Sequence, residues 1–297
     1  MPPRLPTDHY VTAQDGLRLH VAEYGERTAA GLPVICLPGL ARTAADFAEL
    51  AAALAGDPDR PRRVLALDYR GRGLSDHDRD PANYTIAVEL ADVLAVLIAR
   101  EVERAAFIGT SRGGLITMVL ATERPTVIAG VVLNDIGPVI EPQGLMRIKS
   151  YVGKLPAPHN IEDGAEVLRR LFADQFPKLG DADWQSWARK TWREDVGRLM
   201  PTYDTRLALG LAAIDLEHPL PPLWEQFDAL ADVPLMVIRG GNSDILSAAT
   251  VAAMRARRRD ITVLEIPDQG HAPLLTEPAT IARISAFVRD CEDRRPG

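Results

Sequence analysis

Cysteine and long apolar runs are both nearly absent from this sequence. Its 297 residues include two cysteines, Cys36 and Cys291, which are too few for a disulfide framework or a cysteine-based metal site. The opening residues lack the apolar core of a secretory signal, and no stretch approaches the roughly 18 apolar residues of a membrane-spanning helix. We therefore expect a cytoplasmic protein with no membrane segment, in which Cys36 is a small core residue.

The sequence also lacks an excess of positive charge. The sequence has 34 lysines and arginines against 41 aspartates and glutamates, a net charge of −7, whereas a protein that binds nucleic-acid phosphates needs a basic face. The histidines show no paired ligand spacing, so we expect no metal and no cofactor. The expected partner is a small-molecule substrate and not a nucleic acid, and the sequence predicts no oligomeric state.

What the sequence does contain is a series of apolar segments that alternate with helical patterns. An Asp15-Gly16 pair between two alternating runs predicts an opening β-hairpin. Continuous apolar runs, typical of buried parallel strands, follow at residues 33–37, 64–67, 104–108 and 131–133. The pattern predicts an α/β fold with a mostly parallel central sheet and helices on both faces. Ligands of such sheets bind at the carboxyl ends of the strands.

The alternation stops after residue 137, and only helical patterns remain as far as residue 222. We therefore predict a helical cap at residues 138–222, inserted between two parts of the core at residues 1–137 and 223–297. All four tryptophans lie in this segment or at its exit. Their side chains form either the small core of the cap or part of an apolar acyl pocket, and the sequence leaves both possibilities open.

A serine lies at a sharp corner between a predicted strand and a predicted helix. Residues 109–113 read Gly-Thr-Ser-Arg-Gly, directly after the strand-like run 104–108 and directly before a helical pattern. Such a corner strains the backbone and brings chain segments close together, which is why glycines flank it. The hydroxyl of Ser111 is then lifted clear of the sheet, where a base can reach it. We predict that Ser111 is a nucleophile.

Candidates for an acid and a base follow in the loops after two later strands. Asp244 comes after the apolar run 233–238, and His271 lies in a Gly-His-Ala-Pro loop after the run 261–266. A free serine hydroxyl is too weak an acid to attack at neutral pH, so Ser111 needs a base. His271 can supply it.

Two further segments complete the pattern: Leu37-Pro38-Gly39-Leu40, and residues 68–75, which read Asp-Tyr-Arg-Gly-Arg-Gly-Leu-Ser. With Ser, Asp and His in this chain order, the sequence resembles the α/β-hydrolase superfamily, in its cap-bearing, esterase-like branch of serine hydrolases. The resemblance implies the α/β-hydrolase fold. It also implies an oxyanion hole made by the backbone N–H groups of Leu40 and Arg112.

The resemblance places the acid of the triad at Asp244, after the penultimate strand. The alternative acid is Asp135, at the end of the preceding strand, a position that some relatives use instead. Either carboxylate would hold one tautomer of His271 and stabilise its imidazolium form.

Other charged residues lie beside these motifs. We expect Asp68, Arg70 and Ser75 to be structural supports of the corner, because charged residues near a buried turn usually satisfy backbone or ion-pair needs. The side chain of Arg112 has two possible roles, a salt bridge to a carboxylate of the protein or recognition of an anionic group on the substrate.

The expected activity is that of a serine hydrolase. Ser111 would attack a small-molecule carboxylic ester or lactone and form an acyl-enzyme, with His271 as base and Asp244 as orienting acid. A serine nucleophile disfavours the similar haloalkane dehalogenases and epoxide hydrolases, which need a carboxylate. The alternatives are hydrolysis of a carbon–carbon bond in aromatic ring-cleavage products, and a ligand receptor built on the hydrolase fold.

Overall fold

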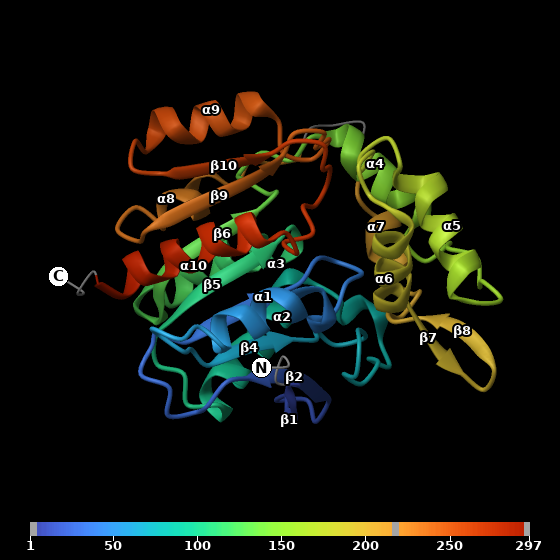
Figure 1. Ribbon diagram of the computed structural model, residues 1–297, viewed down its shortest axis with the longest axis horizontal. Helices are drawn as coiled ribbons and strands as arrows, with labels where there is room; N and C mark the ends of the chain where they lie inside the picture. Colours follow the sequence, from blue (N-terminus) through green and yellow to red (C-terminus); the bar gives the residue numbers. More distant parts are fainter. Residues whose placement is uncertain (1–4, 216–219, 294–297) are drawn as a thin grey trace.

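The computed structural model describes residues 5–215 and 220–293. It contains an eight-stranded sheet in the order β1-β2-β4-β3-β5-β6-β9-β10 (Figure 1). The strands are β1 Thr7–Thr12, β2 Arg18–Tyr24, β3 Val34–Leu37, β4 Val64–Leu67, β5 Ala105–Thr110, β6 Ile128–Asn134, β9 Leu235–Gly240 and β10 Thr262–Ile266. The pairs β1–β2 and β2–β4 are antiparallel and the other neighbouring pairs are parallel. The predicted α/β fold with a mostly parallel sheet is confirmed.

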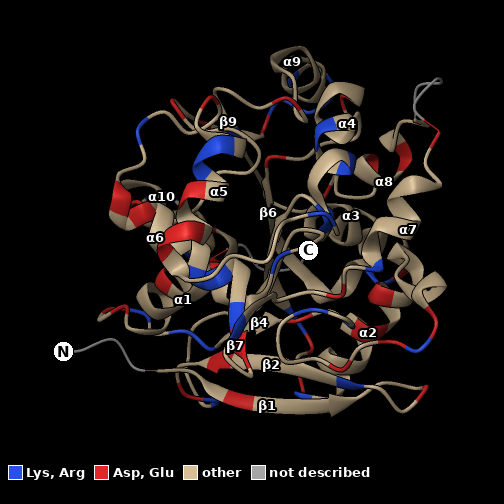
Figure 2. Ribbon diagram, turned by 90° about the vertical axis from the view of Figure 1, so that its right-hand side faces the viewer, with Lys and Arg blue, Asp and Glu red and all other residues tan. Residues whose placement is uncertain are grey.

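The central strands are buried along their whole length. Strands β3, β4 and β6 contain no exposed or partly exposed residue, and β3 to β6 carry no charged side chain. Charged residues lie instead on helices, loops and the outer strands (Figure 2). A parallel sheet that is covered on both faces has this continuous apolar composition.

Helices cover both faces of the sheet. Residues of α2, α3, α8 and α9 pack in one apolar cluster with one face, and residues of α1 and α10 pack in a second cluster with the other. These helices are α1 Ala48–Ala55, α2 Ile86–Ala99, α3 Arg112–Glu123, α8 Trp224–Asp228, α9 Ala248–Arg257 and α10 Pro278–Asp293, with short 3₁₀ turns at Ala44–Phe47, Pro81–Asn83 and Pro125–Val127. Cys36 is fully buried in the second cluster, as predicted. None of the helices in the described part of the chain is long and apolar enough to cross a membrane.

Residues 142–212, between β6 and α8, lie to one side of the sheet (Figure 1). This segment contains α4 Pro142–Tyr151, α5 Ile161–Phe172, α6 Asp181–Thr191, β7 Trp192–Asp195, β8 Arg198–Pro201 and α7 Leu207–Ala212. The expectation of helices alone is wrong here, because β7 and β8 form an antiparallel hairpin. Its turn places Val196 and Gly197 at φ 46° and 72°. A two-residue turn of type I′ has positive φ at both positions, and Val-Gly lacks its usual Asn or Asp signal. The division into a cap at 138–222 and two core parts stays a prediction.

The opening hairpin forms where the sequence predicts it. Strands β1 and β2 pair from Thr7 with Glu23 to Thr12 with Arg18. Gly16 takes φ 87° in the turn between them, a value that glycine reaches without steric cost.

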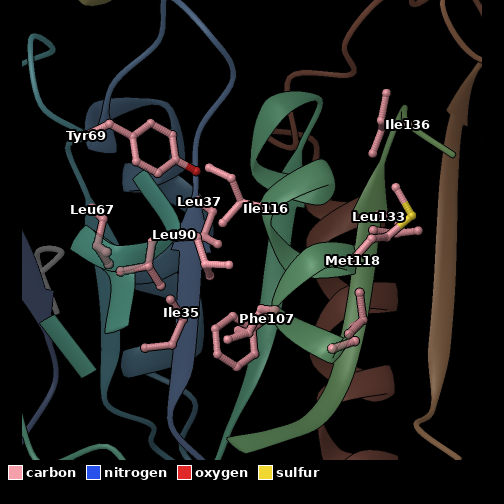
Figure 3. Packing of buried hydrophobic residues seen from close by; sticks show 14 of the residues in the cluster. Ile35, Leu37, Leu67, Tyr69, Leu90, Phe107, Ile116, Met118, Leu133 and Ile136 are labelled. Carbon is pink, nitrogen blue, oxygen red and sulfur yellow. The ribbon is translucent and has the colours of Figure 1, made fainter. Parts of the chain in front are cut away.

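The apolar cluster between α2, α3 and the sheet generates a test of the fold (Figure 3). Ile35 is fully buried in β3, whereas Ile98 on α2 is 72% exposed. We expect Ile35→Ala to lower the free energy of unfolding by about 2–5 kcal/mol, because it removes buried methyl groups and leaves a cavity. The matched change Ile98→Ala should alter it by no more than about 0.5 kcal/mol. Chemical denaturation measures both, and equal losses would contradict the placement of β3.

Candidate active site

Three candidate residues follow the carboxyl ends of parallel strands. Ser111 comes directly after β5, Asp135 directly after β6, and His271 lies in the loop after β10. Because the strands run in parallel, these ends meet at one edge of the sheet. The fold therefore brings together side chains that are far apart in the sequence.

The corner at Ser111 is tight. Ser111 takes φ 50°, which is strained for a residue with a side chain. A Cβ atom added to Gly109 would lie 2.5 Å from the backbone of Gly113, and one added to Gly113 would lie 2.1 Å from the carbonyl oxygen of Leu37. Glycine is required at both positions because β5, α3 and β3 approach so closely. The packing holds the serine at the end of the strand, as the sequence motif predicts.

A hydrogen-bonded chain connects Ser111, His271 and Asp135. His271 Nε2 lies 2.8 Å from Ser111 Oγ, and His271 Nδ1 lies 2.8 Å from Asp135 Oδ2. An ionised carboxylate only accepts hydrogen bonds, so Nδ1 carries the proton and Nε2 of the neutral ring is free to accept from the hydroxyl. This is the tautomer that a general base needs.

The carboxylate of Asp135 accepts hydrogen bonds from two groups besides His271. Its side chain is fully buried, its Oδ1 accepts from Gly240 N at 2.8 Å, and its Oδ2 accepts from Ser243 Oγ at 2.6 Å. Hydrogen bonds from three donors hold the carboxylate in one orientation. They also connect the loop after β6 to the end of β9.

The prediction that Asp244 partners His271 is wrong. Arg147 of α4 donates to both carboxylate oxygens of Asp244, Nε to Oδ2 at 2.6 Å and Nη2 to Oδ1 at 2.8 Å. Burial alone would raise the pKa of Asp244, but the two bonds from Arg147 outweigh it and hold this pKa below its usual value. The alternative acid, Asp135, occupies the place beside the histidine.

The sequence could not separate the two acids because both follow neighbouring strands, β6 and β9. The direction in which the loop after β9 turns decides which of the two carboxylates lies beside His271. There the neighbouring residue, Ser243, points its hydroxyl at Asp135, while the backbone carbonyl of Asp244 accepts from Gly144 N of α4 at 3.0 Å. Arg147 and Ser243 were not among the predicted site residues, and no local pattern in the sequence identifies them.

The two predicted oxyanion donors lie beside the serine. Arg112 is the first residue of α3, so its N–H has no acceptor within the helix. Gly39 O accepts from Arg42 N at 3.2 Å, and in a trans peptide the N–H points away from the C=O. The N–H of Leu40 therefore points to the opposite side of this turn. A Cβ atom added to Gly39 would lie 3.9 Å from Ser111 Cβ, which places the turn next to the nucleophile.

The other charged residues near the motifs make structural contacts. Asp68 accepts from the backbone N–H groups of Ala44 at 2.7 Å and Leu74 at 3.0 Å, and Ser75 donates to Asp68 O at 2.7 Å. Arg70 forms a bidentate pair with Asp92. The three residues thus make contacts within the protein, as expected, but these contacts hold residues 68–75 and do not reach the corner at Ser111.

The side chain of Arg112 points toward α2 and does not line the pocket beside Ser111. Its Nε donates to Glu89 of α2 at 2.5 Å, and its Nη2 donates to Tyr84 O at 3.1 Å. Of the two roles considered for this side chain, the contacts match the salt bridge within the protein.

A pocket of about 210 Å³ opens above Ser111. Its apolar wall comes from α4 to α6 and includes Ile148, Tyr151, Leu168, Phe172 and Trp187. Phe176, Trp184 and Trp192 instead belong to a separate apolar cluster of this segment, in which Phe172 also takes part. Aromatic side chains of this segment therefore line the pocket, form the separate cluster or, at Phe172, do both.

The polar wall of the pocket contains Arg42, which sequence reasoning missed although it lies two residues after Leu40. Arg42 makes a bidentate pair with Asp46 and donates to Thr191 Oγ1 at 2.9 Å. Burial alone would lower the pKa of Arg42, but Asp46 outweighs it and raises this pKa above its usual value. The guanidinium thus connects the turn beside the nucleophile to α6.

Comparison with known proteins identifies the family. The model of the alpha/beta hydrolase family matches residues 34–284. The chain belongs to this family. The crystal structure of an alpha/beta hydrolase from Novosphingobium aromaticivorans is 41% identical, with a TM-score of 0.86, and the match covers 96% of this chain and 98% of that one. The protein is therefore a hydrolase with the α/β-hydrolase fold, as the resemblance of the motifs implied.

Two curated relatives are also hydrolases. The 3-hydroxybutyrate-oligomer hydrolase of Cupriavidus necator is 34% identical over 272 residues, which cover 86% of this chain and 87% of the relative. The 2-(acetamidomethylene)succinate hydrolase of Mesorhizobium japonicum is 26% identical over 290 residues, 96% and 97% of the two chains. Within the described ranges 5–215 and 220–293, this hydrolase has no group of three or more His, Cys, Asp or Glu side chains that could hold a metal ion.

The close packing of the serine corner in this hydrolase predicts the effect of a single methyl group. We expect Gly113→Ala to lower the free energy of unfolding by several kcal/mol or to prevent folding, because its Cβ would lie 2.1 Å from Leu37 O. Gly210 on α7 has open space around it, so Gly210→Ala should be neutral or stabilise the protein by up to about 1 kcal/mol. Thermal or chemical unfolding measures both variants. A fully stable Gly113→Ala protein would contradict the corner geometry.

Proposed function

We propose that the protein is a serine hydrolase that cleaves a small-molecule carboxylic ester through an acyl-enzyme on Ser111. The hydrogen-bonded chain Ser111–His271–Asp135 at the base of a pocket carries this proposal. It has the connectivity of nucleophile, base and orienting acid. Asp135, and not Asp244, is the proposed acid.

The geometry supports a two-step reaction. His271 Nε2 takes the proton of Ser111 Oγ as the oxygen attacks the ester carbonyl, and the N–H groups of Leu40 and Arg112 stabilise the resulting oxyanion. The ester C–O bond then breaks, and the leaving alcohol receives the proton from His271. A water molecule, deprotonated by the same nitrogen, attacks the carbonyl of the acyl-enzyme. The bond to Ser111 Oγ then breaks, the acid is released, and the proton on His271 returns to Ser111 Oγ. Asp135 keeps Nδ1 protonated throughout and stabilises each imidazolium.

An ester of a short hydroxy acid fits this site best. The relative that acts on 3-hydroxybutyrate oligomers is 34% identical over most of the chain. The cavity of about 210 Å³ is smaller than the usual ligand site of roughly 300–1,000 Å³, which favours a short acyl group. Its apolar wall suits the carbon chain, and the carbonyl would lie near Leu40 and Arg112. We therefore propose short hydroxyalkanoate oligomers and simple butyrate esters as substrates.

The assignment of the acid predicts opposite results for two matched variants. Asp135→Asn should lower kcat for p-nitrophenyl butyrate and for a 3-hydroxybutyrate trimer by about 10⁴-fold, because an amide would favour the wrong tautomer of His271. Asp244→Asn should retain nearly all of the activity, since Asp244 pairs with Arg147. Ser111→Ala sets the background rate, and circular dichroism checks that each variant is folded. If Asp244→Asn were the inactive variant, Asp244 would be the acid; if wild-type protein cleaved no ester, the proposed activity would be wrong.

A further inference from the structure

A buried carboxylate joins the two residues whose backbone would stabilise the oxyanion. Glu89 lies in the first turn of α2 and is fully buried. Two guanidinium groups converge on it: Arg72 Nη1 lies 2.8 Å from Oε1, and Arg112 Nε lies 2.5 Å from Oε2. Arg72 is also fully buried. An unpaired charge in such a place is very costly, so the three groups depend on one another.

On one side, this cluster holds the turn that contains Leu40. Arg72 Nε donates to Leu40 O at 2.8 Å, and Arg72 Nη1 donates to Arg70 O at 2.7 Å. The guanidinium also lies over the rings of Tyr69 and Tyr84, at 5.7 and 5.3 Å from their centroids. With its carbonyl fixed in this way, Leu40 has little freedom to rotate its peptide groups.

On the other side, the cluster holds the first residue of α3. Arg112 contributes its backbone N–H to the proposed oxyanion hole, while its side chain bonds to Glu89 and to Tyr84 O. Glu89 is therefore connected to both proposed donor residues. It contacts Arg112 directly, and it contacts Arg72, which binds the carbonyl oxygen of Leu40.

We propose that Glu89 is a positioning residue that sets the separation of the two oxyanion donors. This inference rests on the proposed serine hydrolase activity. Oxyanion donors act when they lie about 2.7–3.1 Å from the position of the developing charge, and a misplacement of about 1 Å can cost about 10²-fold in rate. Glu89 does not line the pocket. Its effect is on the transition state and the tetrahedral intermediate, because the ground-state ester has no oxyanion.

The protein offers a matched control on the same helix. Asp92, three residues along α2, is also buried and forms a bidentate pair with a buried arginine, Arg70, at 2.7 Å for both bonds. The other carboxylate partners of Arg70 are Asp15 and Asp78, and none of these residues lines the pocket. A loss of buried charge pairing at Asp92 should therefore affect stability without moving the oxyanion donors.

The test compares Glu89→Gln with Asp92→Asn in the full-length protein. For each we would measure the unfolding temperature, kcat and KM for p-nitrophenyl butyrate, and inhibition by butylboronic acid, which forms a tetrahedral adduct, and by butyrate. Both variants should unfold at lower temperature. Glu89→Gln should also lower kcat by about 10–100-fold, with KM nearly unchanged. Its boronic acid inhibition constant should rise by a similar factor while that of butyrate stays the same. Asp92→Asn should keep kcat, KM and both inhibition constants.

A second variant covers the case in which Glu89→Gln fails to fold. Arg112→Met removes the same ion pair with Glu89, but it changes a side chain that is partly exposed. It should give the same selective loss of kcat and of boronic acid binding. If both single variants fold, the double variant should lose little more than either one, because the two residues act as one unit.

Three outcomes would overturn the inference. The first is a Glu89→Gln enzyme with the kcat of Asp92→Asn, and the second is a loss that falls equally on boronic acid and butyrate binding. The third is an Arg112→Met enzyme with unchanged kcat. Each of these, found alongside an active wild-type enzyme, leaves the proposed activity intact. A wild-type protein with no ester turnover would overturn both.

Discussion

The contact between the corner after β5 and the end of β3 is the constraint on which the rest of the site depends. Gly113 packs so closely on Leu37 O that no side chain fits between them. That contact fixes Ser111 in a strained conformation, sets the first N–H of α3 beside it, and brings the turn at Gly39 and Leu40 within reach. Backbone packing therefore sets the approximate positions of the nucleophile and of both proposed oxyanion donors, and the role proposed for Glu89 is to fix the separation of those donors.

Two buried carboxylates then hold the residues around this corner in place. On one side Asp135 collects hydrogen bonds from His271, Ser243 and Gly240, and so joins three strand ends. On the other side Glu89 is the common partner of two arginines. Each carboxylate is costly to bury without its partners, which are hydrogen-bond donors for Asp135 and two guanidinium groups for Glu89. We infer that this mutual dependence keeps the proposed site in one arrangement, because the loss of any member leaves a buried charge without its partner.

Local patterns in the sequence predicted the strands, the corner and the histidine that lies beside Ser111, because each of these features has a signal in residues close together in the chain. The apolar runs of β3 to β6 and the glycines around Ser111 are of this kind. The carboxylate beside His271 was misplaced because Asp244 pairs with Arg147, which lies on α4 and reaches Asp244 only in the folded protein. The β7–β8 hairpin was missed because its Val-Gly turn carries a weak signal. The sequence did contain a signal for Glu89. This residue lies on the same face of its helix as Val93 and Leu97, and a charge on an apolar face needs a buried partner.

The most direct test of the account is covalent labelling with a fluorophosphonate, which traps a serine that a neighbouring base activates. Peptide mass spectrometry would locate the modified residue while ester turnover is followed in the same sample. The account predicts one label per chain, on Ser111, with activity lost in proportion to labelling and no label in Ser111→Ala. Labelling at another residue, or full ester turnover after complete modification of Ser111, would contradict it.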